Sequence, residues 1–142
     1  EVCLLKQIKK KLPIGIENFA KLQAEDFYYV DKTMLIKELL DNWAEVNLFT
    51  RPRRFGKSMA ANMLAAYYDR SESTEELFKN LSISKDDSYK ENLNQYDVIK
   101  INMQEFLSMT DTIEEMLEML KNYLVSDFEE TYPTVRFRDK KI

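Results

Sequence analysis

The sequence predicts an α/β fold, built as three layers with helices on both faces of a mostly parallel sheet. Two short apolar runs, residues 46–50 and 98–103, have the character of strands, and the second alternates apolar with polar side chains. A helical pattern follows each run, and the order strand, helix, strand, helix is typical of parallel sheets with right-handed crossovers. Because such sheets usually hold about five strands or more, two strands predict an incomplete part of a larger domain.

We divide the chain into a helical lead-in over residues 1–44 and a partial core over residues 45–142. An aromatic, extended segment in the lead-in ends at Asp31, which is predicted to be the N-cap of the next helix. The competing interpretation makes Asp31 a magnesium ligand, because an apolar run that ends in an acid is also the outline of a Walker B strand. A helical pattern follows Asp31 at once, which favours the N-cap.

Two helices are predicted in the partial core. The first spans residues 57–68, and its larger apolar side chains recur at the spacing of one helical face. These residues are Met59, Met63 and Tyr67. The second helix begins after Asp111 as its cap, with Glu114 completing a capping box, and it carries a continuous apolar stripe that ends near Tyr132.

The composition excludes several functions. The 142 residues hold 21 Lys and Arg against 25 Asp and Glu, a net charge of −4, which disfavours a broad grip on a nucleic-acid backbone. The chain has no histidine, which removes histidine triads, histidine bases and most zinc sites. The single Cys3 forms no disulfide within the chain, and the apolar runs are too short to cross a membrane. We therefore expect a cytoplasmic protein with no membrane partner.

One motif carries chemistry. Residues 50–58, Thr-Arg-Pro-Arg-Arg-Phe-Gly-Lys-Ser, follow the first predicted strand and open a predicted helix, which is the context of the phosphate-binding loop G-x-x-x-x-G-K-[S/T]. Gly56 lets backbone N–H groups approach the phosphates, Lys57 can reach the β- and γ-phosphates, and Ser58 can place its hydroxyl on Mg²⁺. The motif predicts that the chain binds a nucleotide, ATP with Mg²⁺, as the N-terminal part of a P-loop NTPase.

The loop departs from the usual pattern at its first position, where an arginine replaces glycine, and the proline that follows partly compensates by fixing φ. We predict that the whole loop binds the nucleotide and that its serine is the metal contact. The loop residues are Arg51, Pro52, Arg53, Arg54, Phe55, Gly56, Lys57 and Ser58. The simpler interpretation is a solvated basic loop before a helix. The helix dipole disfavours a lysine in the first turn, and a bound anion would remove that penalty, which favours the phosphate loop.

No apolar strand that ends in an acid follows the motif. Asp97 stands at the wrong end of the second predicted strand, and Glu105 lies beyond it. Hydrolysis of ATP needs an acid that holds Mg²⁺ and an oriented water. We therefore predict no catalytic residue within this chain and expect those acids outside it.

Three segments in this order resemble the bacterial AAA-ATPase-like family. They are residues 11–16 (Lys-Leu-Pro-Ile-Gly-Ile), residues 29–33 (Tyr-Val-Asp-Lys-Thr) and residues 48–58, which include the loop. In that family Arg-Pro-Arg-Arg-Phe-Gly-Lys-Ser/Thr stands in for the ordinary Walker A, which implies that Arg51 is the family's own variant. The resemblance also implies a P-loop ATPase whose Walker B strand lies further along the chain, often followed by a PD-(D/E)xK nuclease-like domain.

Two functions remain open at this point. The first is ATP binding in a fragment of an ATPase that does not turn ATP over alone. The second is a non-catalytic interaction module whose basic loop contacts an acidic partner. Nucleic acid would enter only through the downstream domain that the resemblance implies. Because an incomplete sheet exposes strand edges, we also expect self-association or a second chain that covers the edge.

Overall fold

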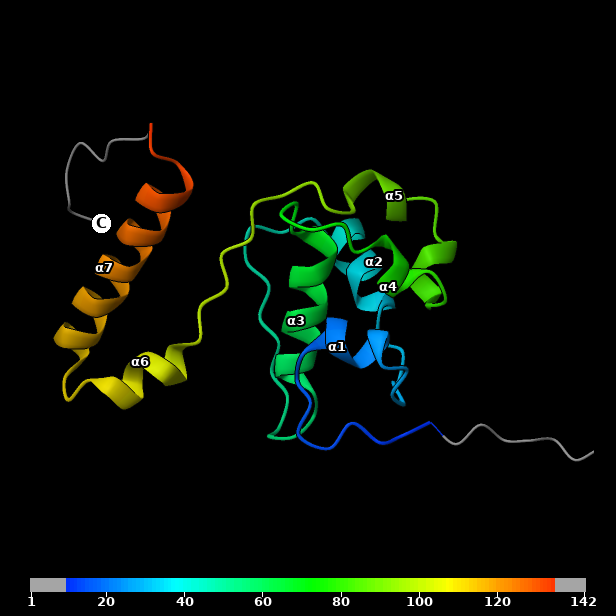
Figure 1. The fold of residues 1–142 in the computed structure, drawn as a ribbon, viewed down its shortest axis with the longest axis horizontal. Coiled ribbons are helices and arrows are strands. Elements are labelled where there is room, and N and C mark those ends of the chain that lie inside the picture. Colours follow the sequence, from blue (N-terminus) through cyan, green and yellow to red (C-terminus); the bar gives the residue numbers. More distant parts are fainter. Residues whose placement is uncertain (1–9, 135–142) are drawn as a thin grey trace, which may run out of the picture. The chain divides into compact units, whose positions relative to one another are not determined.

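The computed structural model describes residues 10–134, which form helices joined by extended connections (Figure 1). In chain order the elements are α1 (Phe19–Ala24), α2 (Met34–Asp41), α3 (Lys57–Tyr68), α4 (Glu75–Phe78), the 3₁₀ helix η1 (Ser82–Lys85), α5 (Tyr89–Asn92), α6 (Met103–Met109) and α7 (Ile113–Thr131). The chain divides into two compact units, Glu1–Ile99 and Lys100–Ile142. Cys3 and the first part of the predicted lead-in lie outside the described residues. The predicted division after residue 44 stays a prediction.

The predicted α/β fold with a mostly parallel sheet is wrong. Residues 10–134 contain no sheet, and their one β-bridge joins Asp69 to Tyr96 in a parallel sense. Residues 46–50 run as an extended segment without ladder partners. Val46 and Leu48 are each 84% exposed, so this run is not the buried strand that its composition predicts.

The second predicted strand is also absent. Residues 98–103 are extended at their start, Ile99 is 58% exposed, and Met103 already begins α6. Apolar composition marks a segment that is suited to a sheet, but the ladder needs a neighbouring backbone that supplies N–H and C=O groups. In the part of the chain that the structure describes, neither run has such a neighbour, and the parallel pair that we predicted between them does not form.

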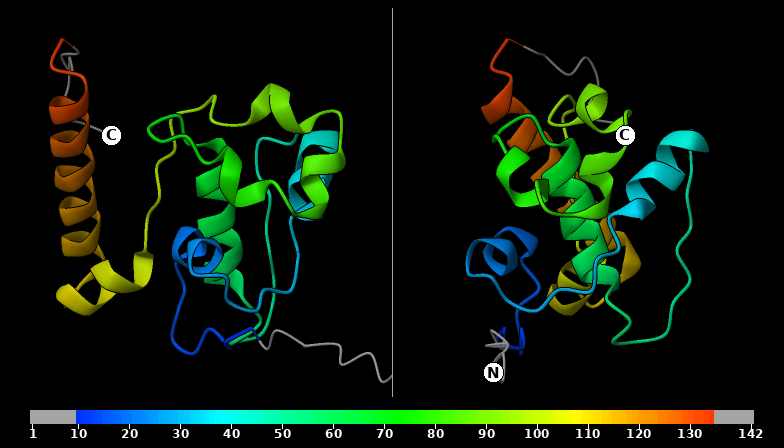
Figure 2. Two further views of the ribbon diagram at one scale, coloured as in Figure 1. Left: turned by 45° about the vertical axis from the view of Figure 1, so that its right-hand side comes forward. Right: turned by 90° about the vertical axis from the view of Figure 1, so that its right-hand side faces the viewer.

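The core of the first unit is largely aromatic. Its buried residues are Phe19, Ile36, Met63, Tyr67, Phe78, Ile83 and Tyr89. The helix α1 packs on α3 and α4, and η1 packs on α2 and α5; Figure 2 shows α1 lying against α3. Met63 and Tyr67 are fully buried on one face of α3, which confirms the predicted face of this helix. This core fixes α2 and α3, the two helices that border the site described below.

The second unit consists of α6 and α7. The cap of α7 lies one residue later than predicted from Asp111 and Glu114: Thr112 is the N-cap, and its hydroxyl accepts the N–H of Glu115 at 3.2 Å. The Glu115 carboxylate in turn accepts the backbone N–H of Asp111 at 3.2 Å. The predicted end near Tyr132 is confirmed, since Tyr132 is the C-cap.

The helices of the described residues include none with both the length and the apolar character that a bilayer crossing requires.

Candidate functional site

The predicted phosphate loop is the connection that leads into α3. Gly56 is the N-cap of this helix, with φ +76° and ψ 28°, a left-handed conformation that glycine adopts without strain. Its carbonyl accepts the N–H of Ala60 at 2.9 Å and so begins the helix. Arg54 also has a positive φ, of 66°, which costs a residue with a Cβ about 1–2 kcal/mol. Two left-handed residues thus shape the turn that ends at the start of α3.

The N-terminus of α3 carries the partial positive charge of the helix dipole and the cation of Lys57. Within the described residues, no side chain caps this helix and no acid stands in its first turn. The ammonium of Lys57, its first residue, donates to the carbonyl oxygen of Arg51 and to that of Pro52, the latter at 3.3 Å. An ammonium has three N–H donors, so the two loop carbonyls use two of them. The first N–H groups of a helix have no acceptor within the helix, so they add donors at this end of α3.

A cavity of about 470 Å³ opens beside the loop, between α2 and α3, which is within the size range of small-molecule sites. Its lining residues are Lys32, Met34, Leu35, Glu38, Phe49, Arg51, Phe55, Gly56, Lys57, Ala60, Ala61 and Leu64. The structure thus brings together four of the predicted site residues: Arg51, Phe55, Gly56 and Lys57. The other four do not line the cavity: Pro52, Arg53, Arg54 and Ser58.

Sequence reasoning missed two charged residues of this cavity, Lys32 and Glu38. Lys32 precedes α2, and its ammonium lies 3.5 Å from the carbonyl oxygen of Phe55 in the loop. Its place in the segment 29–33, one of the three segments of the family resemblance, is a signal that could have singled it out. Glu38 had no such signal, because its position depends on how the fold places α2 at the cavity that α3 also lines.

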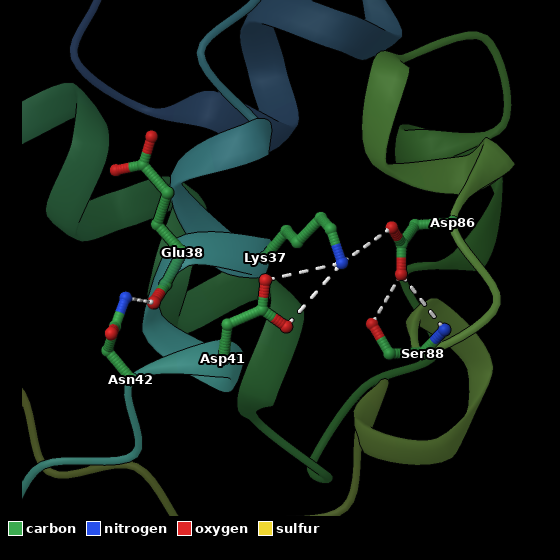
Figure 3. A network of polar contacts seen from close by, with 6 residues as sticks. All are labelled: Lys37, Glu38, Asp41, Asn42, Asp86 and Ser88. Carbon is green, nitrogen blue, oxygen red and sulfur yellow. Dashed lines mark hydrogen bonds and ion pairs between the residues drawn. The ribbon is translucent and has the colours of Figure 1, made fainter.

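The side chain of Glu38 is separated from the polar network on the same helix. In Figure 3 its carboxylate points away from Lys37, whose ammonium lies 3.3 Å from Asp41 and 3.1 Å from Asp86. Hydrogen bonds from Ser88 and from Lys37 hold the pKa of Asp86 below its ordinary value, and the two carboxylates raise the pKa of Lys37. This network ties α2 to the chain beyond η1 and leaves Glu38 to line the cavity.

Asp31 is neither the N-cap of α2 nor placed as a free magnesium ligand. Thr33 occupies the N-cap position, and one carboxylate oxygen of Asp31 accepts the N–H of Thr33 at 2.9 Å and its hydroxyl at 2.6 Å. The other oxygen accepts the N–H and the hydroxyl of Ser82, both at 2.7 Å. Burial alone would raise the pKa of Asp31, but the hydrogen bonds from Thr33 and Ser82 lower it below its usual value. Both oxygens are therefore engaged in joining the start of α2 to η1.

A metal centre built from side chains is absent from residues 10–134, which hold no group of three or more His, Cys, Asp or Glu residues placed to bind one ion. The predicted contact between Ser58 and Mg²⁺ stays a prediction. Ser58 is the second residue of α3, one position after Lys57.

Comparison with known proteins agrees with the resemblance drawn from the sequence. Residues 13–141 match the AAA-ATPase-like family model, described as predicted AAA-ATPase, and the chain belongs to this family. Over 76 residues the chain is 43% identical to a protein described as "uncharacterized protein in vnfD 5'region" from Azotobacter chroococcum mcd 1. That match covers 53% of this chain and 14% of the relative, so the chain spans only a small part of the relative's length. No solved structure matches the chain.

Proposed function

We propose that this chain binds ATP together with Mg²⁺ in the cavity beside residues 51–58. The observation that carries the proposal is the position of Lys57, which starts a helix with no acid in its first turn and lies on the wall of a cavity of about 470 Å³. Membership of a family described as predicted AAA-ATPase supports nucleotide use in general. The residue-level assignment is our own.

The phosphates are expected at the loop. The N–H groups of the first turn of α3 donate to anions, and the helix dipole adds a partial positive charge there. Lys57 contributes the cation, and it exchanges one neutral carbonyl for a phosphate oxygen, which forms a stronger, charge-assisted hydrogen bond. Ser58, next along α3, is the residue assigned to Mg²⁺.

The base is expected on the apolar wall of the cavity. Met34 and Leu35 of α2 form one side of this wall, Leu64 of α3 another, and Phe49 supplies an aromatic ring. Ligand sites usually combine such an apolar lining with a few polar groups, and this cavity has both. The cavity is therefore suited to a nucleoside joined to a polyphosphate.

We assign binding to this chain and not turnover. Hydrolysis needs an acid that holds Mg²⁺ and a group that orients the attacking water. Both oxygens of Asp31 are taken by protein hydrogen bonds, and we give Glu38 no catalytic role. The acids for hydrolysis are proposed to lie outside this chain.

Calorimetric titration of the 142-residue chain with ATP, with and without Mg²⁺, tests the proposal. Replacing Lys57 by Ala removes a charge-assisted contact of about 1.5–3 kcal/mol, so the affinity should fall roughly ten- to a hundredfold. Ser58→Ala should weaken the Mg²⁺ dependence more than nucleotide binding itself. Lys79→Ala is the matched control, because Lys79 is exposed and its ammonium pairs with Glu76, at 3.4 Å. If Lys57→Ala binds ATP as well as the parent chain, the phosphate loop is wrong and an interaction module with an acidic partner takes its place.

A further inference from the structure

We infer that Lys32 is a second cation for the phosphates and makes the site selective for nucleoside triphosphates over monophosphates, an inference that rests on the proposed function. Lys32 lies outside the loop motif, 24 residues before Gly56 in the sequence. Its ammonium is nevertheless 3.5 Å from the carbonyl oxygen of Phe55. It also lies 3.5 Å from the point where a Cβ on Gly56 would stand. The tip of this side chain thus covers the turn that opens α3.

The backbone of Lys32 is held in place by the residues on either side. Residues 29–32 lead into the turn at Thr33 that opens α2. Tyr29 packs edge-on against Phe19, with ring centroids 5.5 Å apart, and its hydroxyl donates to the sulfur of Met63 at 3.4 Å. Thr33 is fully buried. The intervening Lys32 projects from a fixed segment, and only its own side chain has to adjust to a ligand.

The present contact of the ammonium is weak. A separation of 3.5 Å is at the long limit for an N–H···O hydrogen bond, whereas ammonium–phosphate contacts are shorter, about 2.7–2.9 Å, and charge-assisted. Exchanging the Phe55 carbonyl for a phosphate oxygen therefore costs Lys32 only a weak hydrogen bond. Because its anchor is already fixed, Lys32 also loses less conformational entropy on binding than a lysine on a free loop.

The charges around the cavity favour a polyanion. Three cations line it, namely Lys32, Arg51 and Lys57, against a single acid, Glu38, although the chain as a whole has a net charge of −4. Like charges that share one cavity repel one another, and a bound polyanion offsets this repulsion because it attracts each of the cations. A triphosphate gains more from an added cation than a monophosphate does, which is why the inference concerns selectivity and not affinity alone.

The test is a calorimetric comparison of Mg²⁺–ATP and AMP on five proteins: the parent chain and its Lys32→Ala, Lys32→Arg, Lys57→Ala and Lys79→Ala variants. Lys32→Ala should weaken ATP binding by about tenfold or more and AMP binding by about twofold or less. Lys79→Ala should bind both nucleotides as the parent does. Circular dichroism and thermal melts of each variant separate lost binding from lost folding, and Lys32→Arg should recover most of the ATP affinity because it restores the charge.

The outcomes separate this inference from the proposed function. If Lys57→Ala is weakened while Lys32→Ala binds ATP as the parent does, the role of Lys32 is refuted and the phosphate loop stands. If folded Lys32→Ala loses affinity equally for ATP and for AMP, the proposed selectivity for triphosphates is refuted. If the parent and Lys57→Ala bind ATP equally, or the parent binds none, the proposed function fails and this inference fails with it.

Discussion

Asp31 should be a stability residue of the first unit, and its replacement makes the sharpest test of the fold described above. Its carboxylate accepts four hydrogen bonds, two from Thr33 at the start of α2 and two from Ser82 at the start of η1. Asp31→Ala removes all four acceptors. Asp31→Asn leaves one carbonyl oxygen, which can keep the Thr33 side, while its NH₂ group cannot accept the N–H of Ser82.

The expected loss in the free energy of unfolding follows from the kind of hydrogen bond that is removed. A hydrogen bond to a charged group contributes about 1.5–3 kcal/mol when well shielded, but Asp31 is exposed, so water replaces part of each contact. We expect Asp31→Ala to lower the free energy of unfolding by about 2–3 kcal/mol and Asp31→Asn by about 1–2 kcal/mol. Asp41→Ala, which removes an exposed carboxylate paired with Lys37, should cost about 0.5 kcal/mol or less. Urea unfolding followed by circular dichroism measures all three.

The pH dependence of the same variants provides a second measurement. The folded pKa of Asp31 is lowered, so its stabilising contribution is fully present above the unfolded pKa, about 3.9, and is lost as the pH falls through the lower folded pKa. The stability gap between the parent and Asp31→Asn should therefore be widest near neutral pH and should narrow below about pH 4. A gap that stays constant with pH, or an Asp31→Asn protein as stable as the parent at neutral pH, would refute the reasoning.

Two further substitutions test the core and the loop by the same unfolding assay. Tyr67→Phe removes a buried hydroxyl that donates to the carbonyl of Tyr89 at 2.8 Å, and should cost about 1–2 kcal/mol because the carbonyl is left without that donor; an unchanged midpoint would contradict this. Gly56→Ala should cost about 1–2 kcal/mol from left-handed strain alone, since its added Cβ would meet the Lys32 ammonium at an ordinary 3.5 Å. Gly56→Asn should cost less than Gly56→Ala, and the reverse order would point to crowding instead of strain.

Local patterns predicted the helices better than the sheet. The spacing of Met63 and Tyr67 is enough to define the buried face of α3, because a helix closes its hydrogen bonds within one segment. The start of α7 was wrong by one residue, since Asp111, Thr112, Glu114 and Glu115 offer overlapping capping boxes and only the structure selects one. A strand depends on a distant partner, and the apolar run at residues 46–50 carries no information about whether one is present.

The residues of the candidate site also differ in whether local structure or long-range packing places them. The motif located Gly56 and Lys57, whose roles depend on a local turn and a helix start. Lys32 and Glu38 line the cavity because the fold brings α2 and α3 to its two sides, which no spacing within the sequence encodes. Asp31 was predicted to be the N-cap of the next helix, but Thr33 takes that position. The Asp31 partner Ser82 lies 51 residues away, outside the reach of a local capping rule.

Substitutions of the neighbours Asp31 and Lys32, compared with each other, separate effects on stability from effects on ATP binding, which neither substitution does alone. Asp31 accepts hydrogen bonds from Ser82 in the body of the unit, whereas the ammonium of Lys32 lies beside the Phe55 carbonyl of the loop. Asp31→Asn should therefore reduce stability. It should weaken ATP binding only to the extent that it makes residues 29–33 less ordered. Lys32→Ala should reduce ATP binding with little change in stability, because its contact with Phe55 is long and exposed. If both substitutions reduce stability and binding in the same proportion, the segment acts as one structural unit and Lys32 has no separate role toward the phosphates.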